Sequence, residues 1–416
     1  MTRPLTELMK ASRPLSLDEY VAHNGYQAAK IAATLGGPEI IQLIKDSGLQ
    51  GRGGAGFSTG IKMSAVPPMT EPDQTRYLVV NADEMEPGTF KDRWLLEGHP
   101  HQLIEGIIIA ARAISASVAY IFLRGEYKRA EICLAHALQE ASLSGLIPAH
   151  LAIHVHMSAG RYICGEETAL LNALEGRRAT PRAKPPFPQV SGLWGKPTVV
   201  QNVETLCNFP HIIRHGAVWF KSLSKAVDPG TKIFGVSGKV KKPGAFELAM
   251  GTTVREILFE HAGGLWDGLS LRAFLPGGAS TDFLGADFLD VPMDYSSMAQ
   301  KKTRMGTGTM IVLDDHTCPI GMLVNLERFF KQESCGFCTP CREGLSFVHE
   351  TLLAIERGEG LISDLDMLLK HAKILGPGST FCALAPGASA PLASGLRLFR
   401  DDFIEHINHK GCPYGN

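Results

Sequence analysis

The pattern of apolar and polar residues first predicts helices and then an alternation of strands and helices. Apolar residues recur at helical spacing in residues 38–49, and Gly48 ends this predicted helix. From Tyr77 onward, short apolar runs predict strands, and amphipathic stretches between them predict helices. The strands are expected at 77–80, 117–123 and 151–157, and the helices at 101–114 and 126–142. This alternation predicts an α/β fold with a parallel sheet covered by helices.

The pattern changes twice in the second half of the chain. Between about residues 222 and 315, short strands surround a single predicted helix at 254–264, which indicates a small α+β unit. The remaining residues show only helical patterns. These predict four amphipathic helices that pack as a bundle, at 320–334, 342–358, 361–375 and 391–407.

Length and charge narrow the classes of protein that fit. A chain of 416 residues is long enough for roughly two to four domains. Its 41 Lys and Arg against 42 Asp and Glu give a net charge of −1, which argues against binding of nucleic acid. The longest uncharged stretch, between Lys373 and Arg397, contains too many Gly and Pro residues for a membrane-spanning helix. Because the first residues show no secretory signal, we expect a cytoplasmic location without membrane insertion.

The nine cysteines fall into two groups. Cys335, Cys338 and Cys341 form a C-x2-C-x2-C motif, and Cys382 follows later. Three converging thiolates and a remote fourth are the ligand set of a [4Fe–4S] cluster. A structural zinc site is the alternative, although zinc motifs usually use cysteines in pairs. The remaining cysteines are expected to be ordinary buried thiols: Cys133, Cys164, Cys207, Cys318 and Cys412.

A glycine-rich segment at residues 51–62 is the second chemical signal. Gly51, Gly53 and Gly56 fit G-x-G-x-x-G, but a helix precedes them instead of the strand of a dinucleotide-binding fingerprint. The segment also lacks the ending of a P-loop. Such a density of glycine indicates a backbone that closely approaches a flat or phosphorylated ligand. A mobile surface loop is the alternative.

Polar loops follow two of the predicted strands. Residues 81–88 form an acidic loop after the strand at 77–80, and residues 162–168 follow the strand at 151–157. Open α/β sheets bind ligands at the carboxyl ends of their strands, so both loops are expected at one rim. Taken alone, the acidic loop is more typical of a solvated turn.

A proline-rich, basic segment at residues 177–197 comes next. Its prolines would hold Lys184 and Phe187 rigidly over a cofactor, and a plain surface linker is the alternative. Asn202 precedes a predicted helix that it would cap, or it would hold a phosphate. No Ser/His/Asp set stands out among the 15 histidines, so no catalytic acid or base is assigned.

Six motifs taken together resemble one known family. They are GRGGAGFSTG, NADEMEPGTFKDR, YICGEETALLNALEGRR, KPPFP, VETL and ESCGFCTPCREG with Cys382. This order is similar to the NADH-binding, FMN- and [4Fe–4S]-carrying subunit of bacterial respiratory complex I, which is the 51-kDa family. The resemblance implies a Rossmann-like flavin domain, a ubiquitin-like β-grasp domain and a four-helix bundle with the cluster. The expected parts are an N-terminal helical segment with the glycine loop (1–60), the FMN/NADH domain (61–221), the β-grasp domain (222–317) and the bundle (318–416).

The resemblance also implies a role for individual residues. Those at FMN would be Gly51, Arg52, Gly54, Lys62, Asn81, Asp83, Gly165, Glu166, Asn202 and Thr205. Those near the nicotinamide nucleotide would be Phe57, Glu84, Glu86, Glu167, Lys184 and Phe187. Gly53, Gly56 and Tyr162 complete the cofactor-binding set, and Cys335, Cys338, Cys341 and Cys382 would hold the cluster. The chain departs from many members at Gln201 and Ala65, which weakens a phosphate contact and an adenine contact.

The function implied is that of an NADH dehydrogenase. A hydride from NADH would pass to FMN and single electrons to the cluster, and the protein would contribute alignment. The partners implied are a thioredoxin-like [2Fe–2S] subunit and a multi-cluster subunit on the cytoplasmic face of the inner membrane. The diaphorase subunit of an NAD-linked hydrogenase or formate dehydrogenase is the alternative; those subunits commonly carry an added iron–sulfur domain for which this chain lacks length and cysteines. A degenerate scaffold with only a structural cluster is a third hypothesis.

Overall fold

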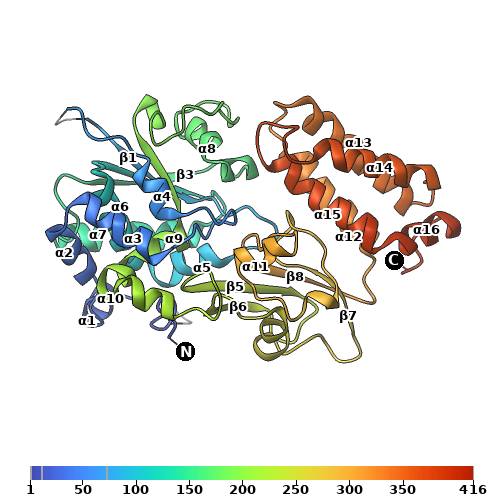
Figure 1. The fold of residues 1–416 in the computed structure, drawn as a ribbon, viewed down its shortest axis with the longest axis horizontal. Helices are drawn as coiled ribbons and strands as arrows, with labels where there is room; N and C mark the ends of the chain where they lie inside the picture. The colour runs from blue at the N-terminus through green and yellow to red at the C-terminus, as the bar shows by residue number, and fades with distance from the viewer. Residues whose placement is uncertain (1, 11–12, 72–73, 416) are drawn as a thin grey trace. The chain divides into compact units, whose positions relative to one another are not determined.

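The computed structural model describes residues 2–10, 13–71 and 74–415 (Figure 1). Contacts within the chain divide it into two compact units. Unit 1 consists of Met1–Met85, Phe90–Ile233 and Glu247–Thr252, and unit 2 of Glu86–Thr89, Phe234–Phe246 and Thr253–Asn416. No helix in the described part of the chain has both the length and the apolar character needed to cross a membrane.

Unit 1 contains a four-stranded parallel sheet. Its strands are β1 (Tyr77–Ala82), β2 (Val118–Leu123), β3 (Ala152–Met157) and β4 (Thr198–Asn202), in the order β3-β2-β1-β4. All three pairings are parallel, which confirms the predicted βαβαβ arrangement. Strand β4 is an addition to the prediction. Its first four residues are all buried, so it lacks the apolar–polar alternation by which an exposed strand is found in a sequence.

Helices cover this sheet and fill the rest of unit 1. They are α1 (Leu17–Ala22), α2 (Gln27–Thr34), α3 (Gly37–Ser47), α4 (Thr59–Ser64), α5 (Lys91–Gly98), α6 (Pro100–Ile114), α7 (Lys128–Leu143), α8 (Glu167–Leu174), α9 (Val203–Cys207) and α10 (Phe209–Ser222). Helix α6 is buried at every position except Arg112, and its IIIAA segment explains why. A helix that is apolar on all sides belongs in the core, and α6 packs against β1, β2 and six other helices.

Helix α3 ends where the glycine-rich loop begins. Pro38 lies in its first turn and Gly48 follows its last residue with φ +70°, a left-handed conformation that glycine adopts without strain. The chain then forms the glycine-rich loop, and α4 begins after Ser58, whose hydroxyl accepts from the backbone N–H of Ile61. The loop is therefore held at both ends by regular helix caps.

A second four-stranded sheet has the order β6-β5-β8-β7. Its strands are β5 (Thr231–Gly238), β6 (Gly244–Ala249), β7 (Leu271–Leu275) and β8 (Thr309–Asp314). Strands β5 and β7 both pair with β8, β5 in parallel and β7 antiparallel. The predicted helix at 254–264 contains a π-helix, Glu256–His261, and a short helix α11 (Tyr295–Gln300) precedes β8. The predicted α+β composition of this region is confirmed.

The C-terminal part of unit 2 is helical, as predicted. Its helices are α12 (Pro319–Glu333), α13 (Thr339–Glu356), α14 (Ile362–Leu375), α15 (Leu384–Leu398) and α16 (Arg400–His409). The single helix predicted at 391–407 was wrong, because the chain leaves helical geometry at Phe399 (φ −112°, ψ 27°). The Phe399 ring packs against Phe283 with ring centroids 5.1 Å apart. Burial of this ring accompanies the turn that separates α15 from α16.

Candidate functional site

The strand order of unit 1 places a ligand crevice beside β1. From β1 the chain adds β2 and β3 on one side, and β4 then pairs on the other side. In open α/β sheets such a reversal leaves a crevice at the carboxyl ends of the two strands, where ligands bind. The loop that follows β1 begins at Asp83, and helix α9 follows β4 directly at Val203. Residues 81–83 and 202 of the predicted site therefore lie at this crevice.

The glycine-rich loop lies against the end of β4. The backbone N–H of Gly51 donates to the carbonyl of Phe57 at 2.8 Å and closes the loop. Gly54 and Gly56 have φ values of +118° and +67°, which side chains at these positions would strain. A Cβ built on Gly53 would lie 3.4 Å from the Cβ of Asn202. The loop thus brings exposed backbone to the crevice, as expected for a flat or phosphorylated ligand.

Asn202 is hydrogen-bonded to a network of buried charged side chains. Lys91 Nζ lies 2.7 Å from Asp92 Oδ1 and 3.0 Å from Glu204 Oε2. Asn202 Nδ2 donates to Asp92 Oδ2 at 2.6 Å, and its Oδ1 caps α9 by accepting from Thr205 N–H. Lys232 Nζ donates to Glu204 Oε2 at 2.9 Å. The predicted capping role of Asn202 is confirmed.

Mutual attraction decides the charge states in this network. Burial alone would raise the pKa of Glu204, but Lys232 and Lys91 lower it to about 2. Burial would lower the pKa of Lys91, yet Asp92 and Glu204 raise it well above its usual value. Lys232 shares Glu204 with Lys91, and burial lowers its pKa to about 8. The Glu204 carboxylate and the ammonium groups of Lys91 and Lys232 are therefore ionised and paired at neutral pH.

Two acidic residues of the loop after β1, Asp83 and Glu84, are buried. Asp83 Oδ2 accepts from the Ser158 hydroxyl at 2.9 Å, which ties the loop after β1 to the loop after β3. Glu84 Oε1 and Oε2 accept from the backbone N–H groups of Asp92 and Arg93, and Tyr127 also donates to Oε2 at 3.0 Å. Burial, reinforced by Asp92, raises the pKa of Glu84 to about 7. The structure thus places Glu84, predicted near the nucleotide, as a buried cap of α5.

Asn81 joins the same loops. Its Nδ2 donates to the carbonyl of Cys164 at 3.3 Å, and its Oδ1 accepts from the Asp83 N–H at 3.1 Å. Asn81 therefore connects the end of β1 with the segment that begins at Tyr162, a short 3-10 helix ending at Gly165. The predicted convergence of these two polar loops on one rim is confirmed.

Charged side chains from α4, from the start of α8 and from the proline-rich segment form ion pairs with one another. Lys62 Nζ lies 2.6 Å from Glu167 Oε2, and Lys184 Nζ lies 2.8 Å from Glu166 Oε1 and 3.4 Å from Glu167 Oε1. Glu166 also caps α8 by accepting from the backbone N–H groups of Thr168 and Ala169. Burial by itself would raise the pKa of Glu167, but Lys62 and Lys184 lower it. The structure therefore brings together four of the predicted residues.

Two aromatic side chains and an open glycine belong to the same part of unit 1. Phe57 is 57% exposed and Phe187 is 54% exposed, unusually high for phenylalanine. Gly165 is exposed, and a Cβ added there would meet no atom within 4 Å. Exposed ring faces and an unfilled space beside Gly165 fit a planar cofactor such as FMN with a nucleotide stacked nearby.

Three predicted residues take other positions. The guanidinium of Arg52 is fully buried, and its Nη2 donates to the carbonyls of Pro229 and Thr231. Its backbone N–H donates to Thr205 Oγ1 at 2.8 Å, so Arg52 and Thr205 stabilise the glycine-rich loop through buried contacts. Glu86 belongs to unit 2, where its Oε1 accepts from the N–H of Ser280 at 2.6 Å. Their roles at FMN or the nucleotide stay predictions.

The motif cysteines lie between helices of unit 2. Cys335 follows α12, Cys338 is the N-cap of α13, and Cys341 lies in its first turn. The backbone N–H of Phe381 donates to Cys338 Sγ at 3.3 Å, which brings the loop of Cys382 next to the motif. The Ser334 hydroxyl lies 3.2 Å from Cys341 Sγ. Four cysteines with backbone and hydroxyl donors to sulfur fit a [4Fe–4S] cluster.

The prediction for the scattered cysteines was only partly right. Cys133, Cys164 and Cys207 are buried thiols, as expected. Cys318 and Cys412 are half-buried and lie next to each other, so the expectation of ordinary buried thiols was wrong for these two. They come from opposite ends of the helical region, and no sequence spacing connects them.

No sequence pattern pointed to the buried ionic network. Lys91, Asp92, Glu204 and Lys232 are at most 3% exposed. Lys91 and Asp92 lie inside the NADEMEPGTFKDR motif, and Glu204 inside VETL, but charged residues are ordinarily assigned to the surface. Only the structure shows that these positions converge.

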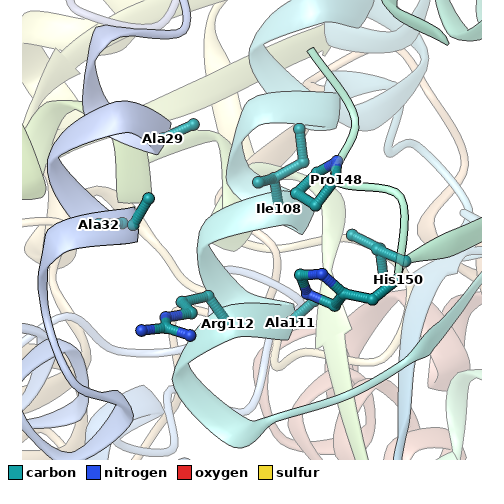
Figure 2. A pocket seen from close by; sticks show the side chains of 9 residues that line it. Ala29, Ala32, Ile108, Ala111, Arg112, Pro148 and His150 are labelled. Carbon is teal, nitrogen blue, oxygen red and sulfur yellow. The ribbon is translucent and has the colours of Figure 1, made fainter. Parts of the chain in front are cut away.

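A small apolar pocket lies elsewhere in unit 1. Its lining includes Ala29 and Ala32 of α2, Ile108 and Ala111 of α6, and Pro148, His150 and Leu151 (Figure 2). Residues 148–151 lead into the start of β3, whereas the ligand crevice lies at the carboxyl ends of the strands. The pocket therefore lies apart from the site.

Family models match most of the chain in three segments. A model described as the Nuo51 FMN-binding domain matches residues 44–211. One described as the SLBB domain matches residues 233–283, and one described as the NADH-ubiquinone oxidoreductase-F iron-sulfur binding region matches residues 321–406. The first contains the glycine loop and the crevice, and the last contains all four predicted cluster cysteines.

Full-length relatives are named as the F subunit of NADH-quinone oxidoreductase. The proteins of Salmonella typhimurium and Escherichia coli are each 52% identical, over 100% of this chain and 94% of the relative. That of Mycobacterium tuberculosis is 44% identical over 94% of this chain and 90% of its own length.

Solved structures of NAD+-reducing [NiFe]-hydrogenase also match. The H2-reduced form gives a TM-score of 0.84 at 32% identity, over 99% of this chain and 67% of that chain. The air-oxidized form gives a TM-score of 0.80 at 35% identity, over 91% of this chain and 64% of that chain.

Proposed function

Since this chain belongs to the family of the NADH-quinone oxidoreductase F subunit, we propose that it is the electron-input subunit of such a complex. It oxidises NADH at FMN and passes electrons through a [4Fe–4S] cluster towards a quinone. FMN would supply hydride acceptance and one-electron release, and the cluster would supply single-electron acceptance. The chemistry left to the protein would be alignment, for which no catalytic acid or base is expected.

The observation that carries this proposal is the glycine loop at the strand-order reversal of unit 1. The glycines of the loop carry no side chain that would keep a ligand from their backbone, and a Cβ added at Gly165 would meet no atom within 4 Å. Asn202 is held by Asp92 at the end of β4, and Asn81 and Asp83 are fixed by neighbouring loops. These groups would bind and orient the flavin, because their own positions are set before the ligand arrives.

The rim residues would then select and orient the nucleotide. Exposed Phe57 and Phe187 offer ring faces for stacking. Lys62 and Lys184, paired with Glu167, place alternating charges where a dinucleotide with phosphates would lie. Cys335, Cys338, Cys341 and Cys382 would hold the cluster in unit 2.

The assembly and location follow from the same membership. We propose a multi-subunit complex in which a thioredoxin-like [2Fe–2S] subunit and a multi-cluster subunit receive the electrons, at the cytoplasmic face of the inner membrane. The domain limits proposed are 1–60, 61–221, 222–317 and 318–416. The hydrogenase or formate dehydrogenase diaphorase remains the second candidate. The NADH-quinone oxidoreductase relatives match at higher identity and over more of their own length than the hydrogenase chains do.

The test uses the open space beside Gly165. A Cβ added at Gly165 meets no atom within 4 Å, so we expect Gly165→Leu to retain the fold while its side chain blocks the flavin. Gly244→Leu is the control, because Gly244 likewise has a negative φ and a Cβ there would meet only Phe246 Cζ, at 3.8 Å. We expect FMN in the purified wild type and the control and at least a tenfold weaker FMN affinity in Gly165→Leu. Equal FMN affinity in all three proteins would contradict the proposed site.

A further inference from the structure

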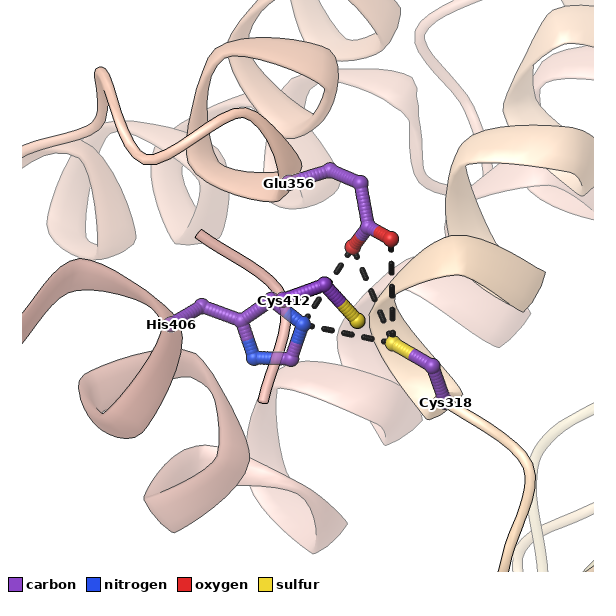
Figure 3. A group of neighbouring side chains, drawn as sticks. All are labelled: Cys318, Glu356, His406 and Cys412. Carbon is purple, nitrogen blue, oxygen red and sulfur yellow. Dashed lines mark hydrogen bonds and ion pairs between the residues drawn. The ribbon is translucent and has the colours of Figure 1, made fainter. Parts of the chain in front are cut away.

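Four side chains outside the cluster motif converge in the helical part of unit 2. They are Cys318, Glu356, His406 and Cys412, and each offers one ligand atom within 4.8 Å of the others (Figure 3). They come from the start of α12, the end of α13, α16 and the segment after α16. We propose that this group binds a structural Zn²⁺ ion, independently of the function proposed above.

The three distances among Cys318, Glu356 and His406 are close to the edges of a zinc tetrahedron. Zinc bonds of about 2.3 Å to sulfur and about 2.0–2.2 Å to nitrogen and oxygen place tetrahedral ligands roughly 3.4–3.8 Å apart. Cys318 Sγ lies 3.2 Å from His406 Nε2 and 3.7 Å from Glu356 Oε2. His406 Nε2 lies 3.3 Å from Glu356 Oε2. Each of these three distances is within a few tenths of an ångström of this range. Cys412 Sγ lies within 4.8 Å of the other three ligand atoms, so it would move inward to complete the tetrahedron.

The imidazole of His406 is oriented for coordination. Its Nδ1 lies 2.7 Å from the backbone carbonyl of Asp402, which can only accept a hydrogen bond. In the neutral ring the proton is therefore on Nδ1, and the lone pair of Nε2 points at Cys318 (Figure 3). A backbone carbonyl on the second nitrogen is a common arrangement for metal-binding histidines. Full burial of the ring keeps it in this position.

The backbone around the group supplies a donor to sulfur and permits close approach of the helices. Cys318 Sγ accepts from the N–H of Gly321 at 3.2 Å, in the first turn of α12, where unpaired N–H groups stabilise negative charge. A Cβ on Gly321 would lie 3.2 Å from Glu356 Oε1. A Cβ on Gly358 would lie 2.0 Å from the carbonyl carbon of Lys410. Glycine at these positions lets α12, α13 and the segment of Cys412 come together.

The donor set selects the metal and the role. Two cysteines, a histidine and a carboxylate in a tetrahedral arrangement suit Zn²⁺, and four protein ligands close the coordination sphere, as in structural sites. The group is distinct from the predicted cluster site. Cys318 and Cys335 flank the two ends of α12, and 17 residues of helical rise separate them by roughly 25 Å. The ion would fasten α16 and the residues after it to the start of α12.

Metal analysis of the full chain tests the proposal. Wild type loaded with one equivalent of Zn²⁺ and then exposed to a chelator should keep about one zinc per chain. Zinc X-ray absorption should show two sulfur and two nitrogen or oxygen ligands, a readout that iron and flavin do not affect. Cys412→Ala should hold zinc at least tenfold more weakly, with unchanged iron and helix content. His409→Gln, an exposed histidine on α16 outside the group, should keep the zinc.

Three results would overturn the proposal. They are a wild type that retains no zinc, a zinc spectrum without sulfur ligands, and a folded Cys412→Ala that retains zinc as wild type does. Since the spectrum is measured on wild type, poor folding of a variant would not leave the question open.

Discussion

Replacement of Glu204 by Gln would remove the shared counter-charge of two buried ammonium groups. Glu204 is fully buried, and its carboxylate lies 2.9 Å from Lys232 and 3.0 Å from Lys91. A pKa of about 2, against an ordinary 4.5, corresponds to roughly 3 kcal/mol in favour of the ionised carboxylate. Loss of one partner of a buried pair typically costs about 3–5 kcal/mol. We therefore expect the free energy of unfolding to fall by about 3–5 kcal/mol at pH 7.

Denaturant unfolding followed by circular dichroism measures this loss. The pKa of Glu204 is lowered, so its contribution is complete above pH 4.5 and disappears as the pH falls towards 2. Glu131→Gln is the control, because Glu131 pairs with Lys128 on the surface and its loss should cost at most about 0.5 kcal/mol. The network also holds Asp92 under Asn202, so the variant should bind FMN more weakly. A loss of stability no larger than in the control would refute the structural reasoning.

Three further predictions concern single residues. Cys338→Ser should lower the iron content and change the low-temperature EPR spectrum of the reduced protein while FMN stays bound; four irons and an unchanged spectrum would contradict the ligand set. Glu167→Gln leaves Lys62 and Lys184 less neutralised, so the kcat/KM ratio should shift from NADH towards NADPH, whose additional phosphate is negative; an unchanged ratio would remove Glu167 from the nucleotide site. Burial raises the pKa of Glu247 to about 7, so wild-type stability should decline as the pH rises from about 4.5 to 7. Glu247→Gln should flatten this decline in thermal unfolding, and parallel stability–pH curves for the two proteins would contradict the role of Glu247.

The regular elements of the fold were predictable because their patterns are local. The helix at 101–114 and the strands at 77–80 and 117–123 follow from runs of apolar residues that any covering layer must bury. Strand β4 was missed because a strand buried on both faces shows no alternation. The break at Phe399 was missed because packing of its ring against Phe283, far away in sequence, accompanies it.

In the candidate site, too, contiguous motifs were predictable and contacts between distant residues were not. The glycine loop and the C-x2-C-x2-C motif are contiguous, so the sequence contains the whole signal. The contacts of Lys232 with Glu204, and of Cys318 with His406, join residues from different elements. Their convergence depends on tertiary packing, which a single sequence without its fold does not display.

The most direct test of the central claim is NADH oxidation by the isolated chain. A full-length preparation that contains FMN and about four irons should reduce ferricyanide with NADH, because hydride acceptance needs only groups within this chain. The same preparation should not reduce a quinone, since that step is expected to need the neighbouring subunits. Phe57→Ala should raise the KM for NADH without loss of iron or FMN. If the loaded wild type showed no NADH-dependent reduction of ferricyanide, the chain would not be an electron-input subunit.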